Sequence, residues 1–457
     1  MSVQAQALPQ GRQLSLMQII LASSAGTVIE WYDFYIYASL AVFFGSLFFP
    51  KADPTAGLLL SLATWGAGFV VRPFGAVVFG RIGDLVGRKY AFLVTLSVMG
   101  IATTLTGLVP TYASIGILAP ILLVLFRLIQ GLALGGEYGG AATYIAEHAP
   151  DARRGYYTSY IQTTATVGIA LALLVVLAFR LWLGDAAFRA WGWRLPFLVS
   201  SLLLLIALYI RLRLQESPLF ARLKDQGKSS KSPLTESLGS GRNWKMILLA
   251  LIGATSGQAT VWYTSQFYAL LFLQTQVFPR TDFVSAPLVV SIAIVLATPF
   301  FLVFGALSDR IGRKPVIMAG LLLAAVTYLP IYHAMKTSGG NWAVLIPLVT
   351  IQVIYVTLVY APIAAFLVEF FPARIRYTSM SVPYHMGNGW FGGLTPLIAA
   401  SIAVATKNIY AGLWWPIATA LLSFVVGGLF LPETNKTRIW DEVGGELAPG
   451  ALAGGGE

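Results

Sequence analysis

Runs of about 20 apolar residues follow one another along almost the whole chain, separated by short polar loops. A run of this length crosses the hydrocarbon core of a bilayer as a helix. Of the 457 residues, 57% are hydrophobic and 11% are charged. A soluble domain carries roughly 25% charged residues, so this chain cannot cover a water-facing surface. The sequence therefore predicts an all-α membrane protein.

Twelve transmembrane helices are predicted, several of them so long that they must tilt or project beyond the hydrocarbon. Their expected bounds are 17–49, 57–80, 90–109, 115–147, 157–183 and 191–213, then 244–275, 284–307, 314–335, 342–371, 377–405 and 409–431. Residues 214–243 are rich in Ser, Lys and Gly, which is typical of a solvated linker. Segments 1–16 and 433–457 are expected outside the membrane, and the last residues, which lack a heptad pattern, are expected to be disordered.

One loop sequence occurs twice. Gly80–Lys89 reads G-R-I-G-D-L-V-G-R-K, and Gly305–Lys314, which begins 225 positions later (305 − 80), reads G-A-L-S-D-R-I-G-R-K. A second pair is E-H-A-P-D-A-R-R-G from Glu147 and E-F-F-P-A-R-I-R-Y from Glu369. A weaker third pair is E-S-P from Glu216 and P-E-T from residue 432. Because the three pairs keep their order, they indicate two pseudo-symmetric six-helix bundles, 17–213 and 244–432.

The Lys and Arg residues predict the orientation of the chain in the membrane. The terminal segments, the central linker and the loops on their side contain 21 of the 30 basic residues, and the opposite loops contain six. By the positive-inside rule, both termini are cytoplasmic. Although the net charge is +11, this scatter over short loops argues against nucleic-acid binding. The chain has no Cys and only three dispersed His residues, so we expect no metal and no cofactor.

The first span carries two acidic residues within its apolar run. The sequence E-W-Y-D-F-Y-I-Y places Glu30, Asp33 and Tyr37 on one face of a helix. A charged side chain at mid-membrane costs roughly 2.5–3.5 kcal/mol on insertion scales, so such a residue faces the interior of the bundle. The fourth span, R-L-I-Q-G-L-A-L-G-G-E-Y-G-G-A, adds Arg127 and Glu137. We predict that Asp33 is a proton site with Glu30, Arg127 and Glu137 around it; the alternative is a structural ion pair.

Arg72 is the candidate for binding a substrate. It precedes Asp84 by 12 residues, which places it about 18 Å from the cytoplasmic loop on a helix. A guanidinium there can hold a substrate carboxylate or can pair with a carboxylate of the first span, and both readings stay open. The sequence also predicts polar and aromatic residues around the substrate, although interhelical hydrogen bonds are the alternative. These residues are Tyr37, Gln258, Tyr263, Gln266, Tyr384, His385 and Asn388.

The repeated loop also predicts a cytoplasmic gate. Asp84 ends a glycine-rich turn, where its carboxylate can accept backbone N–H groups at the N-terminus of a helix. Arg88 can pair with Glu147 or Glu369, and Asp309 and Arg313 are expected to be weaker counterparts of Asp84 and Arg88. The alternative is that the motif only sets loop topology. The predicted gate residues are Gly80, Asp84, Arg88, Lys89, Glu147, Asp309, Arg313 and Glu369.

These motifs resemble a known family. G-R-I-G-D-L-V-G-R-K is similar to the loop signature of the major facilitator superfamily. E-W-Y-D-F, R-P-F-G, the glycine-rich fourth span, W-G-W-R-L-P-F and E-S-P-L-F resemble its metabolite:proton symporter branch, which includes bacterial permeases for 2-oxoglutarate, shikimate, citrate and proline or betaine. The resemblance covers residues 17–435.

The resemblance implies rocker-switch alternating access and proton-driven uptake in a bacterial inner membrane. Osmosensing members carry a C-terminal coiled coil that this tail lacks, so an organic acid is favoured over betaine. We expect a monomeric proton symporter of a small organic acid. A zwitterion symporter or an exporter is the alternative. A membrane enzyme or receptor is disfavoured because there is no Cys/His cluster and no sizeable soluble domain.

Overall fold

The computed structural model describes residues 16–49, 53–212, 224–227, 230, 232–279 and 282–441, and in these ranges the regular structure is helical, without a strand. The first half contains α1 (Leu16–Phe48), α2 (Pro54–Val70), α3 (Arg72–Leu85), α4 (Arg88–Leu108), α5 (Tyr112–Ile115), α6 (Leu118–His148), α7 (Arg154–Leu183), α8 (Asp185–Ala190) and α9 (Leu195–Leu212). The second half contains α11 (Pro233–Leu238), α12 (Gly241–Ala250), α13 (Ser256–Tyr263), α14 (Ala269–Phe272), α15 (Ser285–Ala297), α16 (Phe300–Ile311), α17 (Arg313–Thr337), α18 (Trp342–Tyr360), α19 (Ile363–Phe370), α20 (Arg376–Met386), α21 (Thr395–Thr406) and α22 (Trp414–Phe430).

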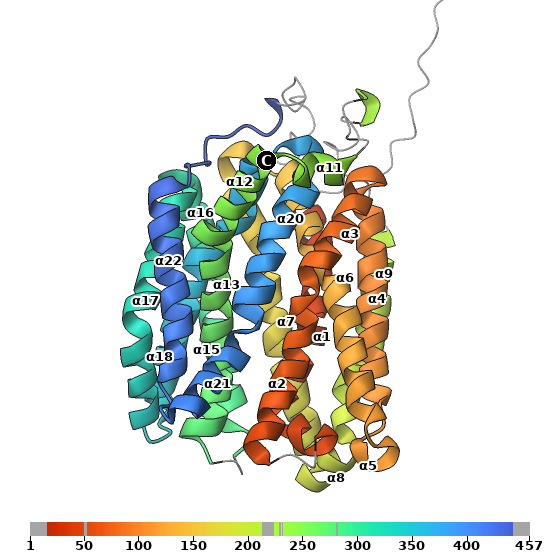
Figure 1. Cartoon of the computed structure of the whole chain (residues 1–457), viewed down its shortest axis with the longest axis vertical. Coiled ribbons are helices and arrows are strands. Elements are labelled where there is room, and N and C mark those ends of the chain that lie inside the picture. The colour runs from red at the N-terminus through yellow and green to blue at the C-terminus, as the bar shows by residue number, and fades with distance from the viewer. Residues whose placement is uncertain are drawn as a thin grey trace, which may run out of the picture.

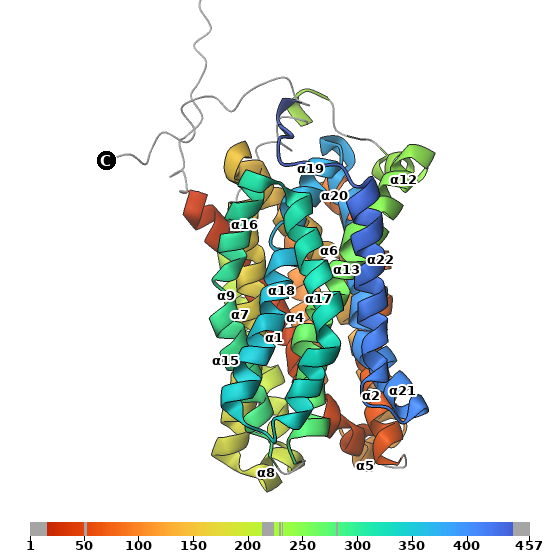
Figure 2. The same cartoon turned by 90° about the vertical axis from the view of Figure 1, so that its left-hand side faces the viewer.

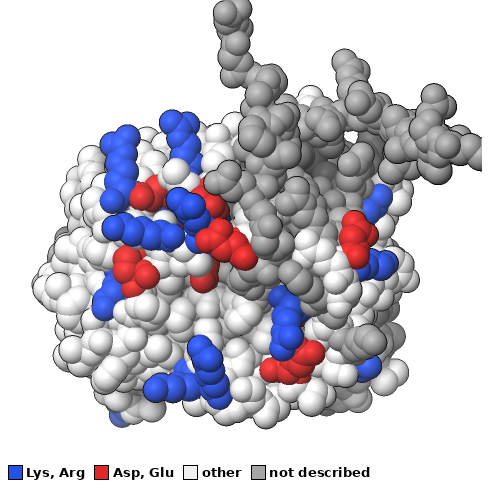
Figure 3. All heavy atoms as spheres, turned by 90° about the horizontal axis from the view of Figure 1, so that it is seen from above, with Lys and Arg blue, Asp and Glu red and all other residues white. Residues whose placement is uncertain are grey.

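The helices stand upright side by side, with α2, α4 and α6 on one side of the molecule and α17, α18 and α22 on the other (Figure 1). The short helices α5 and α8 lie at one end of the bundle, as the turned view in Figure 2 also shows. Residues 224–227 and 232–243 lie at the other end, which we call the linker end. Figure 3 views the linker end, where basic and acidic side chains are interspersed.

The predicted number of membrane spans is confirmed. Among the described residues, 11 helical stretches from Pro54–Leu85 to Ala411–Phe430 are long and apolar enough to cross a membrane. The 33-residue α1 precedes them as the twelfth span. Their bounds lie within a few residues of those expected from the sequence.

The seventh and eleventh spans depart from regular α-helix. The seventh contains the π-helical segments η3 (Leu251–Thr255), η4 (Thr264–Tyr268) and η5 (Leu273–Val277), and the eleventh contains η7 (Gly387–Gly393). A π-helical turn is rare and often lies at a functional site. These segments belong to the two spans that carry all the second-half residues predicted to surround a substrate.

Glycines allow close approach of helices where the halves meet, along the pairs α3 with α20 and α7 with α16. A Cβ on Gly155 would lie 2.7 Å from the carbonyl oxygen of Gly305, and a Cβ on Gly305 would lie 2.7 Å from that of Gly155. Gly80 faces Thr378 in the same manner, since its Cβ would lie 3.1 Å from Cα of Thr378. Any larger side chain at these positions would hold the two halves apart.

The internal repeat is visible in matching contacts. Lys89 Nζ donates to the carbonyl oxygen of Leu212 over 3.0 Å, and Lys314 Nζ donates to that of Leu431 over the same distance. Each bond joins the start of the third helix of a half to the end of its last helix. The two halves therefore repeat one architecture, as the sequence predicted.

Two segments expected to be solvated are partly packed. In the linker, Ser237 of α11 is buried and bonded to Ser379 of α20, because the hydroxyl of Ser379 donates to that of Ser237 over 3.1 Å. In the tail, Ile439 and Trp440 are buried. Within the segment expected to be a solvated linker, Pro233, Ser237 and Asn243 are thus buried, while the other residues of 232–243 are partly or fully exposed. The expected N-terminal segment up to residue 15 and the tail beyond residue 441 lie outside the described residues.

Candidate functional site

Arg72 begins α3 and reaches across the interface between the halves. Its side chain is buried, and one terminal nitrogen donates to the hydroxyl of Tyr263, at the end of α13, over 3.2 Å. Its Nε has no hydrogen-bond partner. Among the residues that the structure describes, no carboxylate lies within ion-pair distance of Arg72. A buried guanidinium is thus held at the interface by a neutral hydroxyl.

The seventh and eleventh spans bring the predicted second-half residues together. Asn388 Nδ2 donates to Gln258 Oε1 over 3.2 Å, which confirms that these two side chains share one wall. The remaining polar atoms of this wall are largely unpaired, although buried polar groups normally have a partner. Buried atoms without a partner are Gln258 Nε2, Asn388 Oδ1, both side-chain polar atoms of Gln266 and both ring nitrogens of His385.

Aromatic rings from both halves surround this wall. Trp31 of α1 lies 5.0 Å from Trp262 between ring centroids, and Trp262 lies 4.7 Å from Tyr360. Tyr138 of α6 stacks on Tyr384 of α20 with ring centroids 3.6 Å apart. Tyr138 and Tyr360 were not predicted. Aromatic residues are frequent in the spans, and nothing in the sequence singles out these two.

Asp33 lies inside the first bundle. It is fully buried, its Oδ1 accepts a hydrogen bond from the hydroxyl of Ser200 on α9, and its Oδ2 has no partner. Arg127 lies within electrostatic reach of Asp33, but its three side-chain nitrogens form no hydrogen bond. The guanidinium of Arg127 instead lies 3.9 Å above the ring of Tyr37. Asp33, Arg127 and Tyr37 are thus brought together, and Tyr37 faces Arg127 rather than the second-half wall.

Glu137 does not belong to this group, which corrects the prediction. It lies ten residues beyond Arg127 on α6, about 15 Å closer to the linker end. There it forms an ion pair with Arg211 of α9 and accepts a hydrogen bond from Thr95 Oγ1 over 3.1 Å. Glu30, by contrast, is buried and forms no hydrogen bond or ion pair with any described residue. It lies within electrostatic reach of Arg72 and Arg211.

Asp84 contacts the other half at the linker end. Its Oδ2 accepts the backbone N–H of Thr378 over 3.0 Å and the hydroxyl of the same residue over 2.7 Å. Thr378 lies in the first turn of α20, where free N–H groups and the helix dipole favour an anion. The predicted contact between Asp84 and a helix N-terminus is confirmed. Beside it, the hydroxyl of Tyr377 donates to the carbonyl oxygen of Gly136.

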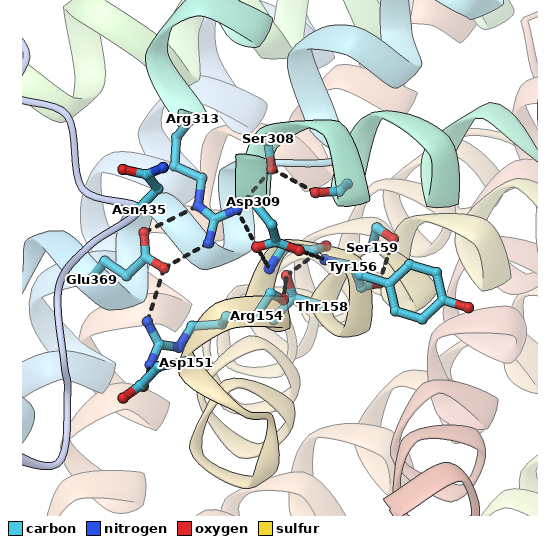
Figure 4. Close-up of polar contacts among 12 residues, drawn as sticks. Asp151, Arg154, Tyr156, Thr158, Ser159, Ser308, Asp309, Arg313, Glu369 and Asn435 are labelled. Carbon is cyan, nitrogen blue, oxygen red and sulfur yellow. Dashed lines mark hydrogen bonds and ion pairs between the residues drawn. The ribbon is translucent and has the colours of Figure 1, made fainter. Parts of the chain in front are cut away.

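Asp309 makes the equivalent contact with α7. It accepts the backbone N–H groups of Gly155 and Tyr156 over 2.8 and 2.9 Å, and it pairs with Arg313 at 2.6 Å (Figure 4). Glu369 lies between Arg313 and Arg154, with 2.9 Å to each. Asp309 and Arg313 were predicted to be the weaker counterparts of Asp84 and Arg88. The structure shows that Asp309, like Asp84, accepts hydrogen bonds from the other half, and the relative strength of the two contacts stays a prediction.

The second repeated motif supplies the cationic partners of the gate glutamates. Glu369 pairs with Arg154, and Glu147 lies 3.6 Å from Arg376. Arg154 and Arg376 each stand seven residues after a glutamate in the repeated motif, so the sequence held a signal that the prediction missed. Arg88 was predicted to be their partner, but its side chain lies outside the described residues.

A pocket lies between the halves at the opposite end. Its volume is about 430 Å³, and Arg180, Arg189, Gln274 and Asp282 contribute to its lining. None of the predicted substrate-binding residues lines it. Arg180 spans this end, with its guanidinium 3.7 Å above the ring of Phe283. This contact joins the two halves at the end opposite the linker.

The fold and the central polar site define a membrane transporter of the major facilitator superfamily, not an enzyme. Residues 18–440 match the family described as sugar (and other) transporter, and the chain belongs to that family. The inner membrane metabolite transport protein YhjE of Escherichia coli (strain K12) is 37% identical, over 84% of this chain and 87% of the relative. The shikimate transporter of the same strain is 36% identical, over 88% of this chain and 90% of the relative.

A solved structure shows the same fold. The proton:xylose symporter XylE, bound to 6-bromo-6-deoxy-D-glucose, matches with a TM-score of 0.73 over 92% of this chain and 97% of its own. Because the two sequences are only 20% identical, this likeness shows the fold alone.

Proposed function

We propose that this transporter is a proton symporter that imports a small organic acid across a bacterial inner membrane. The observation that carries the proposal is Arg72, a buried guanidinium at the interface of the halves whose hydrogen-bond partner is the neutral Tyr263. A buried charge is costly unless it is paired, so this site favours an anionic ligand. A transporter with two repeats holds its substrate at their interface, because only there can the site open to each side in turn. The shikimate carried by a relative is such an acid.

The linker end is cytoplasmic in this proposal. It carries the loops that, together with the central linker and the terminal segments, contain 21 of the 30 Lys and Arg residues. The positive-inside rule assigns such a side to the cytoplasm. The contacts of Asp84 and Asp309 then close the cytoplasmic side, and the pocket beside Arg180 belongs to the entrance from the periplasm.

Asp33 is the proposed proton carrier. Its Oδ2 is buried without a partner, so protonation there breaks no hydrogen bond. Arg127 lies within electrostatic reach and keeps its charge at any physiological pH. Loss of the Asp33 charge would leave Arg127 without a counter-charge, and the helices α1 and α6 that carry these residues would respond by changing their packing. Proton uptake from the periplasm is thereby tied to a structural change in the first bundle.

A zwitterion such as proline or betaine is the second candidate. Trp31, Trp262 and Tyr360 lie close together beside the site, and aromatic faces attract a quaternary ammonium group. A zwitterion also needs a site for its carboxylate, so Arg72 does not exclude it. A proteoliposome assay with shikimate, 2-oxoglutarate, citrate, proline and glycine betaine decides between the two. We expect an inward-directed proton gradient to drive accumulation of at least one of the acids and neither zwitterion.

Replacement of Arg72 tests the anion site. Arg72→Gln should raise the Kd of the transported acid about 10- to 100-fold, the factor expected for losing a hydrogen bond to a charged group. Binding is measured by equilibrium dialysis of the radiolabelled acid with purified protein. The matched control is Arg189→Gln, because Arg189 is half exposed at the opposite end and should leave the Kd unchanged. An Arg72→Gln protein that binds as tightly as the control contradicts the anion site.

Gln258 and Asn388 test the second-half wall. Gln258→Ala and Asn388→Ala should each weaken binding of the same acid about three- to tenfold, the effect of one ordinary hydrogen bond. Gln352→Ala is the control, since Gln352 is also buried in the second half but bonds to Met335 and to its own helix. Unchanged affinity in both test variants would remove this wall from the site.

A further inference from the structure

Three tyrosine rings lie parallel where the halves meet beneath the central wall. Tyr138 comes from the first half, and Tyr360 and Tyr384 come from the second. The planes of Tyr138 and Tyr384 differ by 4°, those of Tyr360 and Tyr384 by 13° and those of Tyr138 and Tyr360 by 15°. The hydroxyls of Tyr360 and Tyr384 are hydrogen bonded, and all three rings are buried. Gln162 of α7 donates to the hydroxyl of Tyr138 over 2.8 Å.

The position of the stack on α20 separates it from the Asp84 contact. From the linker end, α20 carries Thr378, then Ser381, Tyr384 and finally Asn388 in the segment that follows. Thr378 is bonded to Asp84, and Asn388 is bonded to Gln258 of the substrate wall. The stack therefore lies between the wall and the Asp84 contact, about 9 Å from Thr378 along the helix.

The stack also lies near the anion site. The ring of Tyr360 lies 4.7 Å from that of Trp262 between centroids, and Trp262 precedes Tyr263, whose hydroxyl accepts the bond from Arg72. A phenol hydroxyl carries one proton and can donate only one hydrogen bond at a time. A carboxylate held by Arg72 is a stronger acceptor than another phenol, so it competes for the hydroxyl proton of Tyr360.

We propose that Tyr138, Tyr360 and Tyr384 form an inner cytoplasmic gate, separate from the Asp84 contact, and that Tyr360 makes this gate responsive to the substrate. With the site empty, Tyr384 stacks on Tyr138, and in this proposal Tyr360 is the donor in the hydrogen bond between the hydroxyls of Tyr360 and Tyr384. A bound carboxylate takes the hydrogen bond of Tyr360, which frees Tyr384 to leave Tyr138 as the halves part. The role of the stack is independent of the substrate, whereas the role of Tyr360 rests on the proposed function.

Cysteine accessibility tests the stack without any substrate. The chain has no Cys, so Asn388→Cys gives a single thiol on the far side of Tyr384. We expect Tyr138→Ala to speed labelling of this thiol by a membrane-impermeant maleimide, applied to the cytoplasmic face of inside-out vesicles, about two- to tenfold. Tyr138→Phe keeps the stacked ring and loses only the bond from Gln162, so its labelling rate should stay within twofold of the parent. Tyr138→Leu keeps apolar volume and replaces the Ala variant if that variant does not fold. Equal rates in the parent and in the folded variant without the ring overturn the inner gate.

Substrate-dependent labelling tests Tyr360. Shikimate and 2-oxoglutarate are the probes, and Ser381→Cys reports from the cytoplasmic side of the stack, where a bound acid cannot shield it. The acid that binds should speed labelling at this position about two- to tenfold, the factor for one hydrogen bond. Tyr360→Phe should remove this increase while retaining binding measured by dialysis. An increase that persists in Tyr360→Phe overturns the role of Tyr360. If neither acid binds the parent protein, the proposed function is wrong for these substrates, and so is the role of Tyr360 in responding to them. The labelling of the Tyr138 variants still tests whether the stack is a gate.

Discussion

Asp33→Asn is expected to abolish accumulation of the substrate against its gradient, while exchange of labelled for unlabelled substrate continues. Asn is close to Asp in shape and can keep the bond from Ser200, but it cannot take up a proton. Coupling therefore fails, although the bundle stays packed. The measurement is uptake into proteoliposomes under an inward-directed proton gradient, with counterflow exchange measured in the same preparation. We expect a loss of accumulation to the level of empty vesicles.

Two further variants make this result specific. Asp225→Asn removes an exposed aspartate of the central loop and should accumulate substrate normally. Glu30→Gln removes the other acidic side chain of α1, which is buried and has no hydrogen bond among the described residues. If Asp33→Asn still concentrates substrate and Glu30→Gln does not, the proton carrier is Glu30 and the assignment of Asp33 is wrong.

The fold could be predicted because each of its determinants is local in the sequence. The length of an apolar run sets a membrane span, and the paired loops at Gly80 and Gly305 set the relation between the halves. The packing within residues 232–243 was not predicted, because it leaves no local pattern in the sequence. A polar segment can dock by a few hydrogen bonds, such as that between Ser379 and Ser237, without any apolar periodicity.

Site residues could be predicted only where the charge of a side chain within an apolar run identifies it. A charged group in an apolar run must face the interior, and this argument found Arg72, Asp33 and Arg127. It could not decide which charges meet, because rotation and vertical offset of helices come from packing. Glu137 was therefore placed with Asp33, although it pairs with Arg211, 74 positions away in the chain (211 − 137).

Asp84→Asn is expected to shift the transporter toward its cytoplasm-open state and to impair uptake severely. Asp84 can accept the hydrogen bonds from Thr378 only while the two halves touch at the linker end. A charge-assisted hydrogen bond contributes about 1.5–3 kcal/mol, so its loss changes the balance between the two states about tenfold or more. Asp309→Asn should act in the same direction. Asp309 accepts two backbone N–H groups of α7 and also pairs with Arg313.

The direction of the change in cytoplasmic accessibility distinguishes a gate from a loop that only sets topology. With the single thiol of Ser381→Cys, labelling from the cytoplasmic side should rise about tenfold in Asp84→Asn, because Ser381 lies next to the contact that is lost. Asp151→Asn is a demanding control. Asp151 pairs with Arg154 at the same end, but it is partly exposed and belongs to the first half like its partner, so this pair does not join the halves. If labelling changes in Asp84→Asn and Asp309→Asn but not in Asp151→Asn, the closed state is stabilised by the bonds between α3 and α20 and between α16 and α7. If both variants show normal uptake and unaltered labelling, the repeated motif only sets loop topology. The halves are then held closed by apolar packing of the glycine-lined helix pairs.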